Sequence, residues 1–228
     1  MVRSGAVEPP IEMSRNETIR VVVVDDHEMF VQGLAAVLGA DPGIEVVATA
    51  GSVETGTAAV RLHSPDVVLM DYELPDGDGA GATERIKAEV PETQVVMVTS
   101  FDDEGVLVRA IEAGCSGFIT KHKAVQEVAA AVRAADAGEA LISPSMLARL
   151  LPRLRQNPRG VGADLTPREV EVLTLLAVGE SNQKIAEALV LSLHTVRNHV
   201  QNVITKLGAH SKLEAVATAV REGIIRHA

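Results

Sequence analysis

Aromatic residues and cysteines are scarce in this sequence. Its 228 residues include no Trp, one Tyr, three Phe and one Cys, although 46% of them are hydrophobic. The core must therefore be built from Val, Leu, Ile and Ala, and these are numerous enough for an ordinary globular core. One cysteine leaves no intramolecular disulfide to form, which fits a reducing cytosol. We expect Cys115, which lies among small residues, to be a buried hydrophobe and not a reactive thiol.

Long apolar runs are absent as well. No run approaches the roughly 18 residues that a membrane-spanning helix needs. Residues 1–18 also lack the apolar core of a signal peptide. We therefore expect a cytoplasmic protein with no membrane partner, in which residues 1–18 form a disordered extension.

Positive charge is in short supply, and the formal net charge of −10 argues against a generic nucleic-acid binder. The charge is distributed unevenly, however. Residues 18–142 carry 8 Lys and Arg against 21 Asp and Glu, residues 143–164 carry 4 against 1, and residues 165–228 carry 7 against 6. An acidic first half, a basic connection and a nearly neutral end predict two domains with different partners.

Strand-like and helical patterns alternate through the first half. The strands are expected at 19–24, 44–49, 66–70, 94–98 and 117–120, and the helices at 27–39, 53–63, 78–89, 102–113 and 124–137. Five such repeats imply a parallel sheet with right-handed crossovers. Length alone leaves both the strand order 2-1-3-4-5 and a dinucleotide-binding order open, although no G-x-G-x-x-G motif follows the first strand.

The second half is predicted to be a linker followed by four helices. Residues 141–163 contain three prolines and end in a polar, Gly-rich stretch, and Pro152 would interrupt or kink a helix through "SMLARLL". In residues 164–228, Thr166 and Glu169 form a capping box around Pro167 at the first helical position. The further N-caps are Ser181, Ser192 and Ser211, and the expected stops are Gly179 and Gly208.

Acidic residues stand where two of the predicted strands end. Asp25 and Asp26 follow the first strand, and Asp71 follows the third. In the order 2-1-3-4-5 these strands are neighbours, and ligands bind beyond their carboxyl ends. Two carboxylates about 4–5 Å apart repel by about 3–4 kcal/mol at an effective dielectric constant near 20. A bound Mg²⁺ would remove that cost.

Two further residues are expected at the same edge of the sheet. Thr99 follows the fourth strand and Lys121 follows the fifth. A hydroxyl and an ammonium group facing three carboxylates and a metal are typical of phosphoryl transfer, in which a carboxylate can be the nucleophile. We take His27 to be a polar residue of the first helical turn and not a metal ligand.

The third helix of the second half has an apolar stripe and a polar face. The stripe consists of Leu193, Val196, Val200, Val203, Ile204 and Leu207, and the adjacent face of His194, Arg197, Asn198, Gln201 and Thr205. Arg, Asn and Gln read base edges in the major groove, and the short turn before this helix completes a helix-turn-helix. Composition by itself favours the alternative, a solvent-exposed face of an ordinary helical bundle.

The motifs "DDH", "DYELPDGDG", "VTS" and "GFITK" stand in the order found in bacterial response regulators. Residues 19–140 thus resemble their flavodoxin-like receiver domain, with a five-stranded parallel sheet of order 2-1-3-4-5. The resemblance implies that Asp71 accepts a phosphoryl group, which Thr99 and Lys121 contact. It implies that Phe118 changes rotamer on activation, and that Mg²⁺ binds to Asp25, Asp26, Asp71 and the backbone carbonyl of Glu73. Leu74 and His122 depart from the commoner family residues, but neither removes a reacting group.

Residues 165–225 resemble the all-α, four-helix LuxR-type helix-turn-helix domain through "LTPREVEVL", "GESNQKIAEAL", "LSLHTVRNHVQNVITKLG" and "KLEAVATAV". The resemblance implies base contacts by Arg197, Asn198 and Gln201. It implies phosphate contacts by Asn182, Lys184, Thr195 and Lys206. Arg197 stands where the family often has Lys, and as a bidentate donor it can contact a guanine. Gln201 stands where some members have Lys, which affects the strength of the base contacts.

Together the two resemblances place the chain with NarL/FixJ-type two-component response regulators. They imply a transcriptional regulator, not an enzyme, whose partners are a cognate histidine kinase, double-stranded DNA and a second copy when phosphorylated. RNA polymerase is a further candidate partner. One rival is a haloacid-dehalogenase-type phosphatase, which needs a second Asp two residues after the nucleophile, where this chain has Glu73 and no visible cap domain. The other is a protein-binding adaptor whose helical end never meets DNA.

Overall fold

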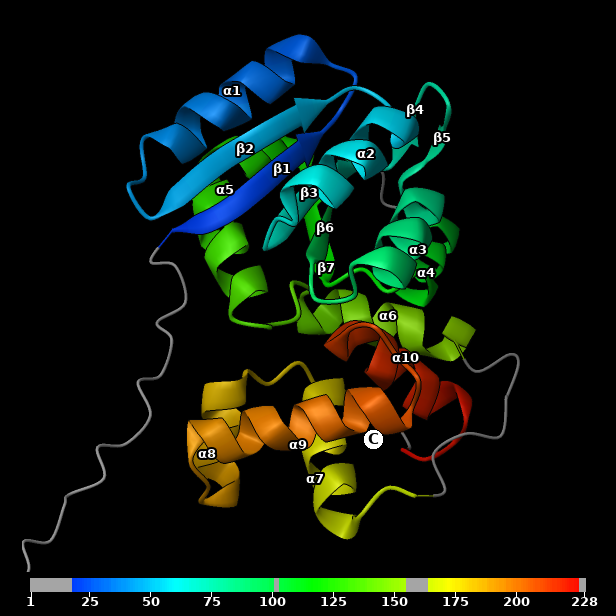
Figure 1. Cartoon of the computed structure of the whole chain (residues 1–228). Coiled ribbons are helices and arrows are strands. Elements are labelled where there is room, and N and C mark those ends of the chain that lie inside the picture. The colour runs from blue at the N-terminus through cyan, green and yellow to red at the C-terminus, as the bar shows by residue number, and fades with distance from the viewer. Residues whose placement is uncertain (1–17, 101–102, 155–163, 226–228) are drawn as a thin grey trace, which may run out of the picture.

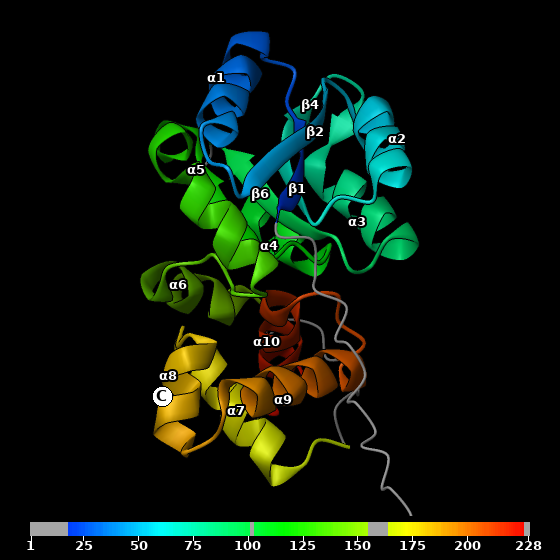
Figure 2. The same ribbon diagram turned by 60° about the vertical axis from the view of Figure 1, so that its left-hand side comes forward.

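The computed structural model describes residues 18–100, 103–154 and 164–225. Apart from Thr18, the predicted N-terminal extension lies outside these residues, as do residues 155–163 of the predicted linker. The described chain forms an α/β domain and a helical domain that lie against each other (Figures 1 and 2). Within the described ranges, no helix combines the length and apolarity that crossing a membrane requires.

The α/β domain contains a five-stranded parallel sheet. Its strands are β2 (Ile44–Ala50), β1 (Ile19–Val24), β3 (Val67–Asp71), β6 (Gln94–Thr99) and β7 (Gly117–Thr120), in that spatial order. This is the predicted order 2-1-3-4-5 once a short hairpin of β4 (Glu73–Leu74) and β5 (Gly77–Asp78) is set aside. The four valines at the end of β1 are buried because helices cover both faces of the sheet.

Two layers of helices cover the sheet (Figures 1 and 2). Helices α1 (Glu28–Gly39) and α5 (Lys121–Asp136) pack on one face, with Leu34 and Val128 among the residues of that core. Helices α2 (Val53–His63), α3 (Gly79–Glu89) and α4 (Glu104–Glu112) contribute to the core on the other face. Helix α5 begins at Lys121, three residues earlier than its pattern suggests, so the residue at the functional edge is also the first residue of a helix.

The helical domain has the four predicted helices. They are α7 (Pro167–Ala177), α8 (Asn182–Leu189), α9 (Leu193–Lys206) and α10 (Lys212–Arg221). Their N-caps are the predicted residues Thr166, Ser181, Ser192 and Ser211, and each side chain accepts a backbone N–H of the first turn. Thr166 and Glu169 form the complete capping box.

Helix α6 (Pro144–Leu154) lies between the two domains, within the segment predicted as a linker (Figure 1). Pro152 does not end this helix, which continues to Leu154. A proline inside a helix costs about 3 kcal/mol. Burial of Leu147 and Leu150 against the helical domain offsets that cost.

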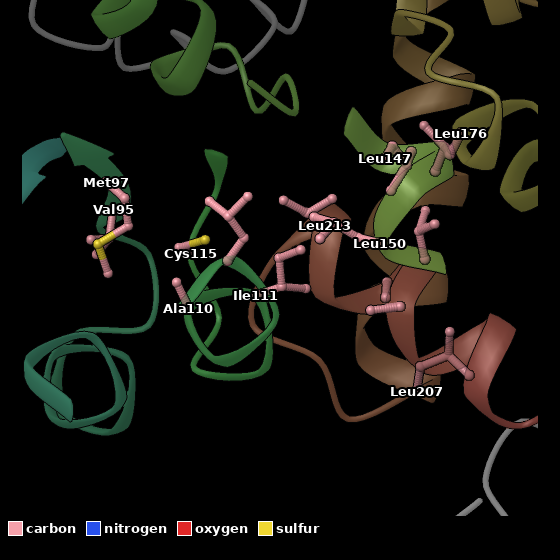
Figure 3. Packing of buried hydrophobic residues seen from close by; sticks show 14 of the residues in the cluster. Val95, Met97, Ala110, Ile111, Cys115, Leu147, Leu150, Leu176, Leu207 and Leu213 are labelled. Carbon is pink, nitrogen blue, oxygen red and sulfur yellow. The ribbon is translucent and has the colours of Figure 1, made fainter. Parts of the chain in front are cut away.

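The core on the α4 side of the sheet continues into the helical domain without a break. Figure 3 shows Ile111 of α4 and Cys115 facing Leu150 of α6 and Leu213 of α10. Cys115 is fully buried, as predicted, and burial raises the pKa of its thiol. The two domains are therefore joined by a shared apolar interface as well as by the chain.

Candidate functional site

Three carboxylates gather at the carboxyl edge of the sheet. Asp25 directly follows β1 and Asp71 ends the adjacent β3, and each is 4% exposed. Asp26 is exposed at the same edge. Carboxylate oxygens of all three residues and a ring nitrogen of His27 lie within 4.8 Å of one another. The parallel topology thus concentrates negative charge at one point.

Lys121 lies between the two buried carboxylates. Its Nζ is 2.7 Å from Asp25 Oδ2 and 2.8 Å from Asp71 Oδ2. The ring of Phe30 on α1 lies 5.1 Å from the same nitrogen, a cation–π distance. Phe30 did not stand out in the sequence, because an aromatic residue in an amphipathic helix carries no distinctive signal.

The pKa values show how strongly the site is desolvated. Burial raises the pKa of Asp71, Lys121 opposes this, and the negative charge of Asp25 adds to it. Burial works against the charge of Lys121, but bonding to Asp25 and Asp71 outweighs it and raises the lysine pKa. One ammonium group faces three carboxylates, so the site favours an additional cation.

The residues present fit a hard divalent cation. Asp25 Oδ2 is buried, and its ion-pair partner is the Lys121 ammonium, which it shares with Asp71. Such an oxygen, together with oxygens of Asp26 and Asp71, provides the kind of ligands that Mg²⁺ prefers. Glu73, whose carbonyl is a predicted ligand, lies at the start of β4 opposite Asp78.

His27 belongs to this cluster more closely than its sequence position suggested. It is the N-cap residue of α1, and its backbone N–H donates to Asp25 Oδ1 at 2.9 Å. Its Nδ1 lies 2.7 Å from Asp26 Oδ1 and 3.1 Å from Asp25 Oδ1. The imidazole therefore helps to fix the orientation of both carboxylates.

Thr99 and Phe118 lie on the next two strands. Thr99 ends β6, is 2% exposed and stands opposite Thr120 in the parallel register. Its neighbour Val98 is in register with Asp71, so Thr99 lies one residue beyond the acidic cluster. Phe118 on β7 is half-buried against the larger core.

Gly79 shapes the loop that follows Asp71. Its N–H donates to the carbonyl of Tyr72 at 2.8 Å. A Cβ at this position would lie 3.1 Å from the carbonyl carbon of Asp71 and 3.1 Å from Met70 Cγ. A glycine is therefore needed where α3 begins, which gives the "DGDG" part of the motif a steric reason.

The predicted DNA-contacting residues fall into two groups. Arg197, Asn198, Gln201 and Lys184 are exposed and Thr195 is half-buried. Lys206 is already engaged, because its Nζ lies 2.7 Å from the buried Glu169 carboxylate and donates to the carbonyl of Asp164. Asn182 is buried, and its N–H donates to Glu139 of the α/β domain at 3.3 Å.

Part of α9 faces the α/β domain across a cleft of about 1030 Å³, which is lined by two residues of its polar face and by Val200 and Ile204 of its apolar stripe. Arg197 and Gln201 line the helical side of this cleft. Asp66, Glu92 and Asp136 line the opposite side. Acidic groups of one domain thus face Arg197 and Gln201, two of the three residues predicted to contact bases.

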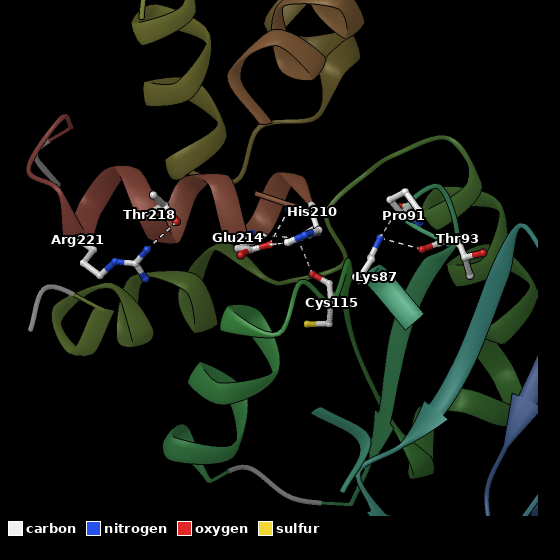
Figure 4. Close-up of polar contacts among 9 residues, drawn as sticks. Lys87, Pro91, Thr93, Cys115, His210, Glu214, Thr218 and Arg221 are labelled. Atoms are coloured by element: carbon white, nitrogen blue, oxygen red, sulfur yellow. Dashed lines mark hydrogen bonds and ion pairs between the residues drawn. The ribbon is translucent and has the colours of Figure 1, made fainter. Parts of the chain in front are cut away.

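Polar contacts join the domains next to this cleft (Figure 4). Ser211 Oγ donates to the Cys115 carbonyl at 2.8 Å. Nearby, Glu214 accepts the N–H of His210 at 2.7 Å, and the buried Lys87 donates to the carbonyls of Pro91 and Thr93. The Ser211 bond joins the start of α10 to the amino-terminal edge of the sheet, whereas the contacts of Glu214 and Lys87 each lie within one domain.

Two family models match this chain. The model described as the response regulator receiver domain matches residues 21–133. The model described as bacterial regulatory proteins, luxR family, matches residues 163–219.

Individual relatives agree with both matches. The chain is 36% identical over 209 residues to the response regulator protein VraR of Staphylococcus aureus, covering 92% of this chain and all of the relative. The structure of the response regulator ChrA, from a heme-sensing two-component system, is 29% identical, covers 92% of this chain and all of that chain, and gives a TM-score of 0.50. A LuxR-family two-component response regulator from Aurantimonas sp. is 30% identical, covers 60% of this chain and 97% of that chain, and gives a TM-score of 0.55.

Proposed function

Because the chain belongs to the two-component response regulators of the NarL/FixJ type, which join a receiver domain to a LuxR-type DNA-binding domain, we propose that phosphorylation of Asp71 controls its binding to DNA. The observation that carries this proposal is the buried Asp71 carboxylate at the end of β3, 2.8 Å from Lys121 Nζ and beside Asp25. The phosphoryl donor is a phosphohistidine of a partner kinase, and the output is transcriptional regulation.

In the transfer step, a carboxylate oxygen of Asp71 attacks phosphorus. The P–N bond to the donor histidine breaks, and its electron pair returns to the histidine nitrogen. Lys121 is placed to neutralise a phosphoryl oxygen as it arrives. Asp25, Asp26, Asp71 and the Glu73 carbonyl would hold Mg²⁺, which supplies further neutralisation of phosphoryl charge. The same attack on acetyl phosphate would release acetate.

Thr99 and Phe118 couple phosphorylation of Asp71 to a change of conformation in the rest of the receiver domain. The hydroxyl of Thr99, at the end of β6, hydrogen-bonds the phosphoryl group, and Phe118 on β7 repacks beside it. Moving a two-state protein from 1:99 to 99:1 requires about 5.5 kcal/mol of differential stabilisation. Charge-assisted hydrogen bonds to a phosphoryl group supply energy of this order.

The unphosphorylated form keeps two of its predicted base-contacting residues turned toward the receiver domain. Arg197 and Gln201 line the interdomain cleft, so a duplex reaches them only after the domains separate. Once released, α9 enters the major groove, where Arg197, Asn198 and Gln201 contact bases and Lys184 and Thr195 contact phosphates. Two phosphorylated copies bind two half-sites about one helical turn apart, or a multiple of it.

The remaining partners follow from this role. The chain meets its kinase and DNA in the cytoplasm, with RNA polymerase as a further contact. Catalytic turnover of a substrate is not part of the proposal, because the position of a phosphatase general acid is occupied by Glu73. A protein-binding adaptor is disfavoured by the match of residues 163–219 to a family of DNA-binding regulators.

The test is intact-mass measurement after incubation with Mg²⁺ and acetyl phosphate. Wild type and Asp41→Asn should each gain one phosphoryl group, because Asp41 is a peripheral carboxylate paired with Arg133. Asp71→Asn should gain none. Selection from a random-sequence duplex library should then enrich specific sites with phosphorylated wild type only. Undiminished phosphodonor-induced DNA binding by Asp71→Asn would contradict the proposal.

A further inference from the structure

A buried ion pair links the receiver domain to the helical domain. Lys212, the first residue of α10, has a side chain that is only 6% exposed, and its Nζ lies 2.9 Å from Glu139 Oε2. Glu139 belongs to the connection between α5 and α6. The same carboxylate accepts the N–H of Asn182, the first residue of α8, at 3.3 Å. One receiver-side carboxylate therefore satisfies two groups of the helical domain.

These groups form a site with a strong preference for an anion. The first N–H groups of a helix lack intrahelical acceptors and carry partial positive charge. Asn182 Oδ1 accepts a hydrogen bond from Lys212 Nζ at 3.0 Å, which fixes the ammonium beside the α8 terminus. Burial lowers the pKa of Lys212, Glu139 opposes this, and the nearby positive charge of Arg197 lowers it further. Without an anion, the buried Lys212 ammonium would keep only the unfavourable charge of the nearby, exposed Arg197.

The anion site lies on the surface that is expected to meet DNA. Asn182 and Lys212 line the interdomain cleft together with Arg197 and Gln201 of α9. In helix-turn-helix proteins the first helix crosses the DNA backbone, and helix N-termini and lysines are common phosphate contacts. A backbone phosphate has the same requirements as the Glu139 carboxylate, which are a negative charge and acceptor oxygens.

We propose that Glu139 acts as a phosphate mimic, which holds the helical domain in its DNA-free position by occupying a site that a DNA backbone phosphate takes in the bound form. This inference rests on the proposed DNA-binding function and names how that function is restrained. Glu139 and DNA compete for the same donors, so the closed protein cannot make this phosphate contact.

The segment that carries Glu139 is attached to the strand that carries Phe118. Leu141, two residues after Glu139, extends the sheet beside β7. Its carbonyl accepts the Phe118 N–H at 2.7 Å, and its N–H donates to the Ser116 carbonyl at 3.1 Å. A Cβ at Gly117 would lie 2.6 Å from Leu141 Cα, so only glycine allows this approach. Movement of β7 after phosphorylation would therefore carry Glu139 away from α8.

The test compares full-length Glu139→Gln with wild type, using a fluorescent 30-bp random-sequence duplex at low salt. Unphosphorylated Glu139→Gln should bind about tenfold more tightly than unphosphorylated wild type, because removing one partner of a buried pair favours separation. The phosphorylated forms of both proteins should bind equally. Glu112→Gln is the matched control, since it removes the same charge and a long 3.7 Å interdomain pair with Arg221. It should change the affinity less than twofold.

A second readout does not depend on DNA. Titration of inorganic phosphate into ¹⁵N-labelled Glu139→Gln should shift the amide resonance of Asn182, whereas wild type, whose site is filled, should show no shift. If phosphorylated wild type binds DNA, two results would overturn this inference alone. One is equal DNA affinity of unphosphorylated wild type and Glu139→Gln, and the other is an equal gain in DNA affinity in Glu112→Gln. Loss of all DNA binding by phosphorylated wild type would overturn the proposed function and this inference with it. If phosphate does not shift the Asn182 amide resonance of Glu139→Gln, the shared anion site is contradicted.

Discussion

Replacing Lys121 with methionine tests the electrostatics of the proposed acceptor site most directly. Methionine keeps an unbranched stem of similar length and removes only the charge. In wild type, Nζ lies 2.7 Å from Asp25 Oδ2 and 2.8 Å from Asp71 Oδ2, and the cluster that contains both carboxylates has ligand atoms within 4.8 Å of one another. At that separation and an effective dielectric constant of 20, the repulsion between the carboxylates is about 3.5 kcal/mol.

We expect Lys121→Met to lower the free energy of unfolding by about 3 kcal/mol in metal-free buffer at pH 7. Mg²⁺ should restore most of this loss, because a cation that binds only the folded state at 100 times its Kd stabilises by about 2.7 kcal/mol. It should also stabilise the variant more than wild type, in which Lys121 competes for the same oxygens. Urea unfolding followed by far-UV circular dichroism measures both effects.

The control is Lys123→Met, which removes the same charge from an exposed position on the same helix. The free energy of unfolding of Lys123→Met should stay within about 0.5 kcal/mol of the wild-type value, both without Mg²⁺ and at equal Mg²⁺ concentrations. A loss below about 1 kcal/mol in metal-free Lys121→Met would refute the repulsion between Asp25 and Asp71. A deficit that Mg²⁺ leaves unchanged would refute cation binding by these carboxylates.

Two further variants probe the close packing at Gly117 and the buried charge of Lys87. Gly117→Ala would place a Cβ 2.5 Å from the Leu141 carbonyl oxygen. We therefore expect it to lower the free energy of unfolding, measured in urea, by about 2 kcal/mol and to tighten DNA binding by the unphosphorylated protein. The control Gly33→Ala, which adds a Cβ in open space on α1, should not lower stability. Lys87 has a pKa lowered to about 8, mainly by burial, so its charge opposes folding fully below pH 8 and ceases to do so as pH rises toward 10.5. The stability of wild type relative to Lys87→Met should therefore rise by about 3 kcal/mol between pH 7 and 10.5 in urea titrations, and a difference independent of pH would contradict the burial of a charged Lys87.

Local patterns were sufficient for the regular elements. The valine run of β1 and the serine and threonine N-caps of the helical domain depend only on residues close together in the sequence. The strand and the helices that they predict are present in the structure. The convergence of Asp25 and Asp71 could be predicted once the family resemblance supplied the strand order, because parallel neighbours end at the same edge. Strand order therefore sufficed to bring distant acidic residues together.

Features that depend on contacts between distant residues could not be predicted in this way. The β4–β5 hairpin has two residues in each strand, too few for any periodicity. Helix α6 passes Pro152 because α10 and the α4 side of the receiver supply its packing. The family resemblance predicted Asn182 as a phosphate contact. Its burial against Glu139, however, depends on how the two domains meet. The contribution of His27 likewise depends on the turn that directs its ring toward Asp26.

The scarcity of aromatic residues gives the molecule a built-in optical reporter. Tyr72 is the single tyrosine and there is no tryptophan, so the ultraviolet emission of the protein comes from one phenol. That phenol belongs to the residue next to Asp71, the proposed phosphoryl acceptor, and burial raises its pKa, so the ring stays in its protonated, emitting form. We therefore expect the Tyr72 emission to change when a cation or a phosphoryl group arrives at Asp71, in the unlabelled, full-length chain and without altering any of its residues.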